Sequence, residues 1–188
     1  MKPKLLACAF ALLLAALTPA PAAFAAKSDS CAHCHGTDGN STASAYPSLA
    51  GQTKQYLYKQ IKAFKEGERK NSMMSPSVGV LTEQDMQDLS EYFSSQTLNR
   101  SNSKTDPAVV AEGKKIADAA QCVACHQPGY KGLNEFPRLS RQKYPYLVKQ
   151  LKDFRDSART NDGGVMLPSV KDLTDVQIEA VAQYLTSM

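Results

Sequence analysis

A five-residue pattern, Cys-x-x-Cys-His, occurs twice in this chain of 188 residues and constrains its fold more than any other feature. The first copy covers residues 31–35 and the second covers residues 122–126. Cysteines three positions apart lie on one face of a helical turn, so both thiols can reach the edge of a flat macrocycle while the next histidine reaches its centre. This spacing is typical of covalent haem attachment, in which two thioether bonds form and the histidine binds the iron. The sequence therefore predicts two covalently bound c-type haems.

The ligands of these haems follow from the two patterns. Thioether bonds are expected from the motif cysteines and axial bonds to iron from the motif histidines: Cys31, Cys34, Cys122, Cys125, His35 and His126. A structural zinc site would need four ligands per metal, and neither motif has a further Cys or His nearby. A thioredoxin-type site would follow a strand in a βαβ unit, and no such strand is visible. A disulfide within each motif is the remaining alternative, but it leaves the two histidines unexplained.

Residues 1–25 have the features of a secretory signal peptide. Two lysines precede an uncharged apolar run, and Ala-Phe-Ala at 23–25 is a small-x-small cleavage site. Retention as a membrane anchor is the alternative, but two prolines interrupt the run where a spanning helix should continue. The fifth cysteine, Cys8, lies in this segment and receives no function. Because haem c is attached outside the cytoplasm in bacteria, we expect a periplasmic protein without stable membrane insertion.

Net charge excludes one class of partner. The chain has 22 Lys and Arg against 18 Asp and Glu, and the signal peptide removes Lys2 and Lys4. The remaining 20 basic residues give a net charge of about +2 before any haem carboxylates are counted. A field that weak does not indicate a nucleic-acid partner, so partners are expected to be recognised by local patches.

A polar stretch without helical periodicity divides the mature chain in two. We expect a first domain at 26–98, a linker at 99–105 and a second domain at 106–188. Domains of this size have a thin hydrophobic core and normally need a staple. A covalently bound haem supplies one, because its apolar ring can form the centre of each core.

The two halves repeat well beyond the motifs. The motifs align at an offset of 91 residues, and the methionines and threonines discussed below align at an offset of 92. Between them, an offset of 90 pairs Pro47, Gln52, Tyr56, Gln60, Arg69 and Asn71 with Pro137, Gln142, Tyr146, Gln150, Arg159 and Asn161. Length differences of one residue fall in loops. The halves are therefore expected to be one fold used twice.

The readable secondary structure is helical. Apolar residues recur with helical spacing from Tyr56 to Phe64 and again from Tyr146 to Phe154, and the first stripe ends at Gly67. Thr82 and Thr174 are expected to be N-caps of closing helices. Asp106 followed by Pro107 is expected to begin a helix in the second half. No segment alternates in the manner of a strand, so the predicted class is all-α.

The sixth ligand of each iron is predicted by elimination. The chain has three histidines, of which two are proximal and His33 lies inside the first motif. Methionine is the other common ligand. Met1 lies in the signal peptide, Met188 is terminal and Met86 belongs to a helical stripe, which leaves Met73, Met74 and Met166. The pattern Met-x-Pro, with a threonine eight residues after the methionine, selects Met74 and Met166. The alternative is that both are gap-filling hydrophobes.

These motifs together resemble the dihaem cytochrome c4 family over essentially the whole mature chain. The shared segments are Tyr-Pro-Ser-Leu-Ala-Gly-Gln at 46–52 with its copy at 136–142, Tyr-Leu-x-Lys-Gln at 56–60 and 146–150, Arg-Thr-Asn-Asp-Gly at 159–163, and Met-x-Pro. The resemblance implies two class I cytochrome c domains around a pseudo-twofold axis, with their haem propionate edges facing each other. It also implies that Pro47 and Pro137 present backbone carbonyls to the proximal imidazoles, a plain turn being the alternative.

His/Met ligation leaves neither iron an open position, so we expect outer-sphere electron transfer and no catalysis. The expected partners are redox proteins: a cytochrome bc1-type quinol-oxidising complex or a dehydrogenase as donor, and a terminal oxidase as acceptor. The chain also resembles the dihaem subunit of flavocytochrome c sulfide dehydrogenases, so a role as a dehydrogenase subunit stays open. A dihaem redox enzyme is a third reading, disfavoured because no further cysteine or histidine is available as a ligand.

The first half departs from the class I pattern at its beginning. Such domains usually begin with a helix that crosses the last one, and only about five mature residues precede Cys31. The first domain is then expected either to be less stable or to expose the face of its last helix, at 83–95, to the second domain or to a partner.

Four repeated polar residues, Tyr56, Tyr146, Arg69 and Arg159, are candidates for hydrogen bonds to haem propionates. Asn71 and Asn161, near the methionine loops, are similar candidates. The alternative for the first four is core tyrosines and solvated arginines.

Overall fold

The computed structural model describes residues 22–100 and 103–188. Cys8 and most of the predicted signal peptide lie outside the described residues, so cleavage after residue 25 stays a prediction. The predicted boundaries of the two domains and the linker likewise stay predictions.

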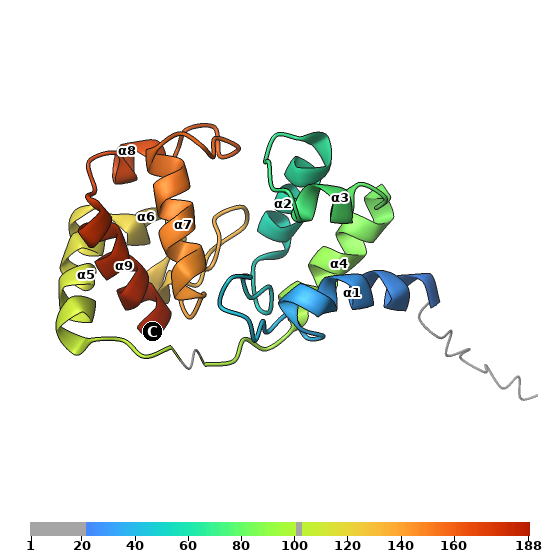
Figure 1. The fold of residues 1–188 in the computed structure, drawn as a ribbon, viewed down its shortest axis with the longest axis horizontal. Coiled ribbons are helices and arrows are strands. Elements are labelled where there is room, and N and C mark those ends of the chain that lie inside the picture. The colour runs from blue at the N-terminus through green and yellow to red at the C-terminus, as the bar shows by residue number, and fades with distance from the viewer. Residues whose placement is uncertain (1–21, 101–102) are drawn as a thin grey trace, which may run out of the picture.

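The described residues form helices in two groups joined by an extended segment (Figure 1). The first group contains α1 (Ala22–His35), α2 (Lys54–Glu66), α3 (Met74–Val78) and α4 (Glu83–Ser95). The second contains α5 (Pro107–Ala119), α6 (Cys122–His126), a 3-10 turn η1 (Pro128–Tyr130), α7 (Tyr144–Arg155), α8 (Leu167–Val170) and α9 (Asp175–Ser187). An isolated bridge between Leu133 and Phe136 is the one strand-like pairing among the described residues. The all-α prediction is confirmed.

Local chemistry explains where the long helices begin and end. Gly67 ends α2 with a φ of 79°, a left-handed conformation that glycine adopts without strain. Thr82 begins α4 with a reciprocal capping box to Asp85, and Thr174 begins α9 with the same box to Gln177. The Asp106 side chain accepts from Ala108 N at the start of α5. The predicted caps are thereby confirmed.

Each half has its own hydrophobic core. The first core contains seven buried residues, Leu57, Phe64, Val78, Leu81, Met86, Leu89 and Phe93. The second contains six, Ala117, Tyr130, Leu147, Val181, Ala182 and Leu185. Cys31 and Met74 pack against the first core and Cys122 packs against the second. At least one predicted haem-binding residue of each half therefore lies at the edge of a small apolar core.

The two halves begin differently. In the second half α5 crosses α9 so closely that a Cβ at Gly113 would lie 2.0 Å from the Ala180 carbonyl oxygen. Gln121, at a φ of 54°, then turns the chain from α5 into α6. In the first half α1 runs without a break through the motif and meets α4 through an ion pair of 2.5 Å between Lys27 and Asp85. The first half was predicted to have too few residues for a helix before its motif, whereas α1 extends back to Ala22 and contacts α4.

The face of α4 that lacks such a cover is polar. Asp88 corresponds to Ala180 at the offset of 92 and is exposed, whereas Ala180 is 4% exposed beneath α5. Glu91 and Ser95, on the same side of α4, are exposed as well. The first domain therefore exposes no apolar stripe on α4 and needs no partner to cover it.

Candidate haem sites

The two motif histidines occupy equivalent, buried positions. His35 is 6% exposed and His126 is 4% exposed. His35 Nδ1 lies 2.8 Å from the Pro47 carbonyl oxygen, and His126 Nδ1 lies 2.9 Å from the Pro137 carbonyl oxygen. Because a carbonyl can only accept, each Nδ1 carries the proton and each Nε2 keeps its lone pair.

That lone pair has no partner in the second half. His126 Nε2 is buried and makes no hydrogen bond, and it is the only such side-chain atom among the described residues. A buried acceptor without a partner is costly unless something else satisfies it. Burial lowers the pKa of both histidines, and the proline carbonyls offset this only in part. Both imidazoles are therefore held in the neutral form that binds a metal.

The four motif cysteines are free thiols, so neither motif contains a disulfide. Burial raises the pKa of Cys31 and Cys122. Cys34 and Cys125 lie one helical turn further along α1 and α6, and Cys125 is exposed. In the first motif, Ser41 donates from Oγ to the Cys34 carbonyl oxygen at 3.0 Å and so holds the end of α1 against the following loop. The thiols are placed for two thioether bonds in each half.

The two predicted methionines occupy equivalent positions at short helices that the sequence did not predict. Met74 is the first residue of α3, and Met166 is the N-cap of α8. Both are partly buried, whereas the neighbouring Met73 is 56% exposed. Val78 of α3 belongs to the first core and Val170 of α8 is buried, so each segment is anchored by an apolar side chain. Met86 is 3% exposed in the first core, as predicted.

The side chains of Asn71 and Asp162 hold the two methionine segments, a role that the sequence did not assign to either residue. The Asn71 Oδ1 atom accepts from the backbone N–H groups of Met73 and Met74, each at 2.9 Å. The Asp162 Oδ2 atom accepts from Met166 N at 2.7 Å. The sequence signal that could have predicted these contacts is an Asn or Asp three or four residues before each Met-x-Pro. His33 is exposed, and its Nδ1 lies 2.9 Å from the Asp29 carbonyl oxygen. Its hydrogen bond is therefore within α1 and not with a methionine segment.

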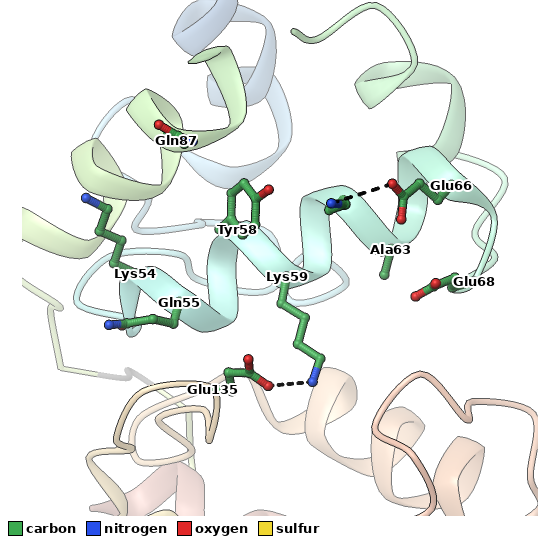
Figure 2. Close-up of a pocket in the computed structure, with 10 residues that line it drawn as sticks. Lys54, Gln55, Tyr58, Lys59, Ala63, Glu66, Glu68, Gln87 and Glu135 are labelled. Atoms are coloured by element: carbon green, nitrogen blue, oxygen red, sulfur yellow. Dashed lines mark hydrogen bonds and ion pairs between the residues drawn. The ribbon is translucent and has the colours of Figure 1, made fainter. Parts of the chain in front are cut away.

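The halves bind each other through the loop that follows each proximal proline. Ser48 is buried and pairs with Gln142 of the other half, and Gln52 pairs in the same way with Arg138. Lys59 of α2 reaches Glu135 across the same boundary at 2.6 Å. Figure 2 shows this ion pair at the edge of an open groove lined chiefly by α2. The groove contains none of the motif residues, so it is not the haem site.

The residues present fit a haem in each half. Each half supplies two thiols one helical turn apart, a buried neutral imidazole with its Nε2 uncommitted, and a partly buried thioether, which in the first half packs against the apolar core. Among the described residues, no group of three or more His, Cys, Asp and Glu side chains could hold a bare metal ion. Fold and sites together define a tandem of two haem-binding domains of one kind.

Comparison with known proteins gives the same class. The cytochrome c family model matches residues 21–97 and again residues 110–188. Cytochrome c4 of Pseudomonas aeruginosa is 39% identical over 178 residues, covering 89% of this chain and 88% of the relative. The thiosulfate dehydrogenase electron acceptor of Thiomonas intermedia is 35% identical over 196 residues, covering 95% of this chain and 89% of the relative.

A solved structure agrees with the sequence comparisons. The crystal structure of reduced cytochrome c4 from Pseudomonas stutzeri superposes with a TM-score of 0.81 at 36% identity, covering 88% of this chain and 97% of that one. The chain belongs to the cytochrome c family, as a dihaem member of the cytochrome c4 type. It is thus an electron-transfer cytochrome with two covalently attached haems, and the predicted family and cofactors are confirmed.

A search for membrane-spanning segments covered residues 22–100 and 103–188. No helix there combines the length and the apolar character needed to cross a bilayer.

Proposed function

We propose that this protein is a periplasmic electron carrier that takes electrons from a cytochrome bc1-type complex or a dehydrogenase and passes them to a terminal oxidase. The observation that carries the proposal is the duplicated, buried histidine whose Nδ1 is committed to a proline carbonyl and whose Nε2 is left for iron. A secretory leader at 1–25 and the covalent haem motifs support the periplasmic location.

Each residue of the site has a defined role in this proposal. Cys31 and Cys34 would hold one haem, and Cys122 and Cys125 would hold the other. His35 and Met74 would bind the first iron, and His126 and Met166 would bind the second. When bound, the two haems supply reversible one-electron exchange between ferric and ferrous iron.

The surrounding residues keep the site closed and fixed. The carbonyls of Pro47 and Pro137 fix the imidazole tautomers and increase the electron donation of each ring to iron. Asn71 and Asp162 hold the backbone of the methionine segments in place. Because a histidine and a methionine would each bind the iron, no position would be left for a substrate, and the protein would carry electrons without catalysing a bond change.

A second candidate function is service to one dehydrogenase as its dedicated electron acceptor or haem subunit. The relative from Thiomonas intermedia, which carries the name thiosulfate dehydrogenase electron acceptor, favours it. Under this reading the haem sites are unchanged, and only the donor protein differs.

The purified holoprotein tests the proposal. Both haems should be low-spin when oxidised and when reduced, and the reduced protein should not bind carbon monoxide. A carrier should accept electrons from a bc1-type complex and from a dehydrogenase in stopped-flow mixing. Exclusive, tight association with a dehydrogenase would favour the second candidate, and carbon monoxide binding to either reduced haem would contradict both.

A further inference from the structure

Two arginines at equivalent positions of the repeat meet at the boundary between the halves. Arg159 is 8% exposed and Arg69 is partly buried. Both guanidinium groups donate to the same atom, Gln60 Oε1, each at 2.8 Å. Both also donate to Gln150 Oε1, at 2.6 Å from Arg69 and 2.7 Å from Arg159. The four side chains therefore form a closed ring across the boundary, with two positive charges in it.

These two charges have no negative partner. One nitrogen of each arginine donates to Gln60 Oε1 at 2.8 Å. These two nitrogens therefore lie at most about 5.6 Å apart, which is twice that distance. Among residues 22–100 and 103–188, no Asp or Glu forms an ion pair with either arginine. Asp153, which lies 3.4 Å from Gln150 Nε2, is paired with Lys149. Amide oxygens are only partial charges, so the repulsion between the guanidinium groups is left uncompensated.

The tyrosines of the same boundary do not supply the missing charge at neutral pH. Arg159 donates to the Tyr56 hydroxyl and Arg69 donates to the Tyr146 hydroxyl, each at 3.2 Å. Burial acts to raise the pKa of Tyr56, but Arg159 and Arg69 outweigh it and lower the pKa to about 8. A phenol with that pKa is mostly neutral at pH 7. The lowered value is a second sign that the site is electropositive.

Arg69 also lies beside the first core, and Arg159 makes the equivalent ring contact in the second half. The Arg69 guanidinium lies over the Phe64 ring at 4.5 Å, and Phe64 belongs to the core against which Cys31 and Met74 pack. Arg159 lies over Phe154 in the same way, also at 4.5 Å. Each haem that these cores hold brings two propionate carboxylates, and the planar guanidinium fork is the side chain best suited to binding carboxylates.

We propose that Arg69 and Arg159 form a shared anion site between the two halves, and that this site takes carboxylates of the bound haems. The proposal rests on the haem assignment above and goes beyond it, because it makes each arginine act on both halves at once. Haem carboxylates then relieve the repulsion inside the ring and tie the two domains together. The charge on the arginines in turn stabilises the ferrous state and raises the midpoint potentials of the haems.

Charge-removing variants of the holoprotein test this site. The variants are Arg69→Gln, Arg159→Gln and the double variant. Lys70→Gln and Arg155→Gln are matched controls, because each removes one positive charge nearby while Lys70 is exposed and Arg155 is paired with Asp156 and Asp175. We expect both arginine variants to lower the midpoint potentials by several times the change in either control. The double variant should lower them further. In redox-difference infrared spectra the carboxylate bands of the haems should shift in the arginine variants only.

Two further measurements separate the alternatives. Titrating the wild-type protein with chloride or phosphate should leave the potentials unchanged. A saturable dependence on the added anion that is lost in Arg69→Gln would instead assign the site to a solution anion and overturn the haem assignment.

If Arg159→Gln does not fold, Arg159→Lys keeps the charge and should retain most of the potential while losing the double contact with the two glutamines. Potentials and carboxylate bands that change no more than in the controls would overturn the proposal. The Met-ligation band of the ferric protein should persist in every variant, so failure here is distinct from failure of the axial ligand assignment.

Discussion

Gln142 of the second half binds the backbone of Ser48 in the first half with both ends of its amide group. Ser48 N donates to Gln142 Oε1 at 2.8 Å, and Gln142 Nε2 donates to the Ser48 carbonyl oxygen at 2.8 Å. The symmetry-related pair is Gln52 with Arg138, at 2.6 and 3.0 Å. Both pairs directly follow the prolines whose carbonyls meet the proximal histidines, so the interface and the two sites share one stretch of backbone.

The first prediction concerns this exchange. Gln142→Ala leaves the buried N–H and carbonyl of Ser48 without partners, so the free energy of unfolding should fall by about 1–3 kcal/mol. Denaturant unfolding of the holoprotein measures it. Gln55→Ala, on the exposed side of α2, is the matched control and should change stability by less than about 0.5 kcal/mol. An equal effect of the two substitutions would show that the pair does not hold the halves together.

The close crossing of α5 and α9 gives a second prediction. In Gly113→Ala the new Cβ would lie 2.0 Å from the Ala180 carbonyl oxygen, so the helices must move apart. We expect a loss of about 1–3 kcal/mol from the second half. Gly79→Ala is the control, because Gly79 has a helical φ of −57° and its nearest contact is 3.6 Å. Thermal unfolding of both variants checks this, and a stable Gly113→Ala protein would contradict the observed crossing.

The caps of the closing helices give a third prediction, on pH. Hydrogen bonds from Lys27 and then Thr82 lower the pKa of Asp85 from 3.8 to about 2. Because the folded pKa lies below the unfolded one, the cap stabilises the protein fully above about pH 4 and loses this contribution as pH falls towards 2. Gln177, at the equivalent position of α9, does not titrate.

Asp85→Gln should therefore remove part of the pH dependence of stability. Its free energy of unfolding should be lower than that of the wild type at pH 5, and the difference should shrink between about pH 4 and pH 2. Asp88→Gln, which changes the same charge outside the capping box, is the control. A difference that stays constant over this range would contradict the role of the charged cap.

Much of this architecture follows from local sequence chemistry. The stripe from Tyr56 to Phe64, the threonine caps and the Asp-Pro start of α5 are signals within a few residues of one another, and each helix lies where they predict. The helices α3 and α8 were missed because four or five residues are too few to show a helical period. The continuous α1 was missed because its first residues belong by composition to the leader.

Contacts across the boundary could not be predicted for a different reason. The repeat shows that Arg69 and Arg159 are equivalent, but equivalence does not say which half each one contacts. Both arginines were expected either to bind haem propionates or to be solvated, whereas each donates to side chains of both halves. Such a pairing depends on how two domains dock, and a local pattern carries no information about docking.

We propose that each half closes both faces of one haem with a histidine and a methionine. Met74→Ala and Met166→Ala remove the two proposed distal ligands one at a time, and Met73→Ala, at the exposed neighbour, is the control. Absorption and magnetic circular dichroism spectra of the ferric proteins measure the number of methionine-ligated irons. We predict two such irons in the wild type and in Met73→Ala, and one in each of the other variants. Two methionine-ligated irons in either Met74→Ala or Met166→Ala would contradict the account.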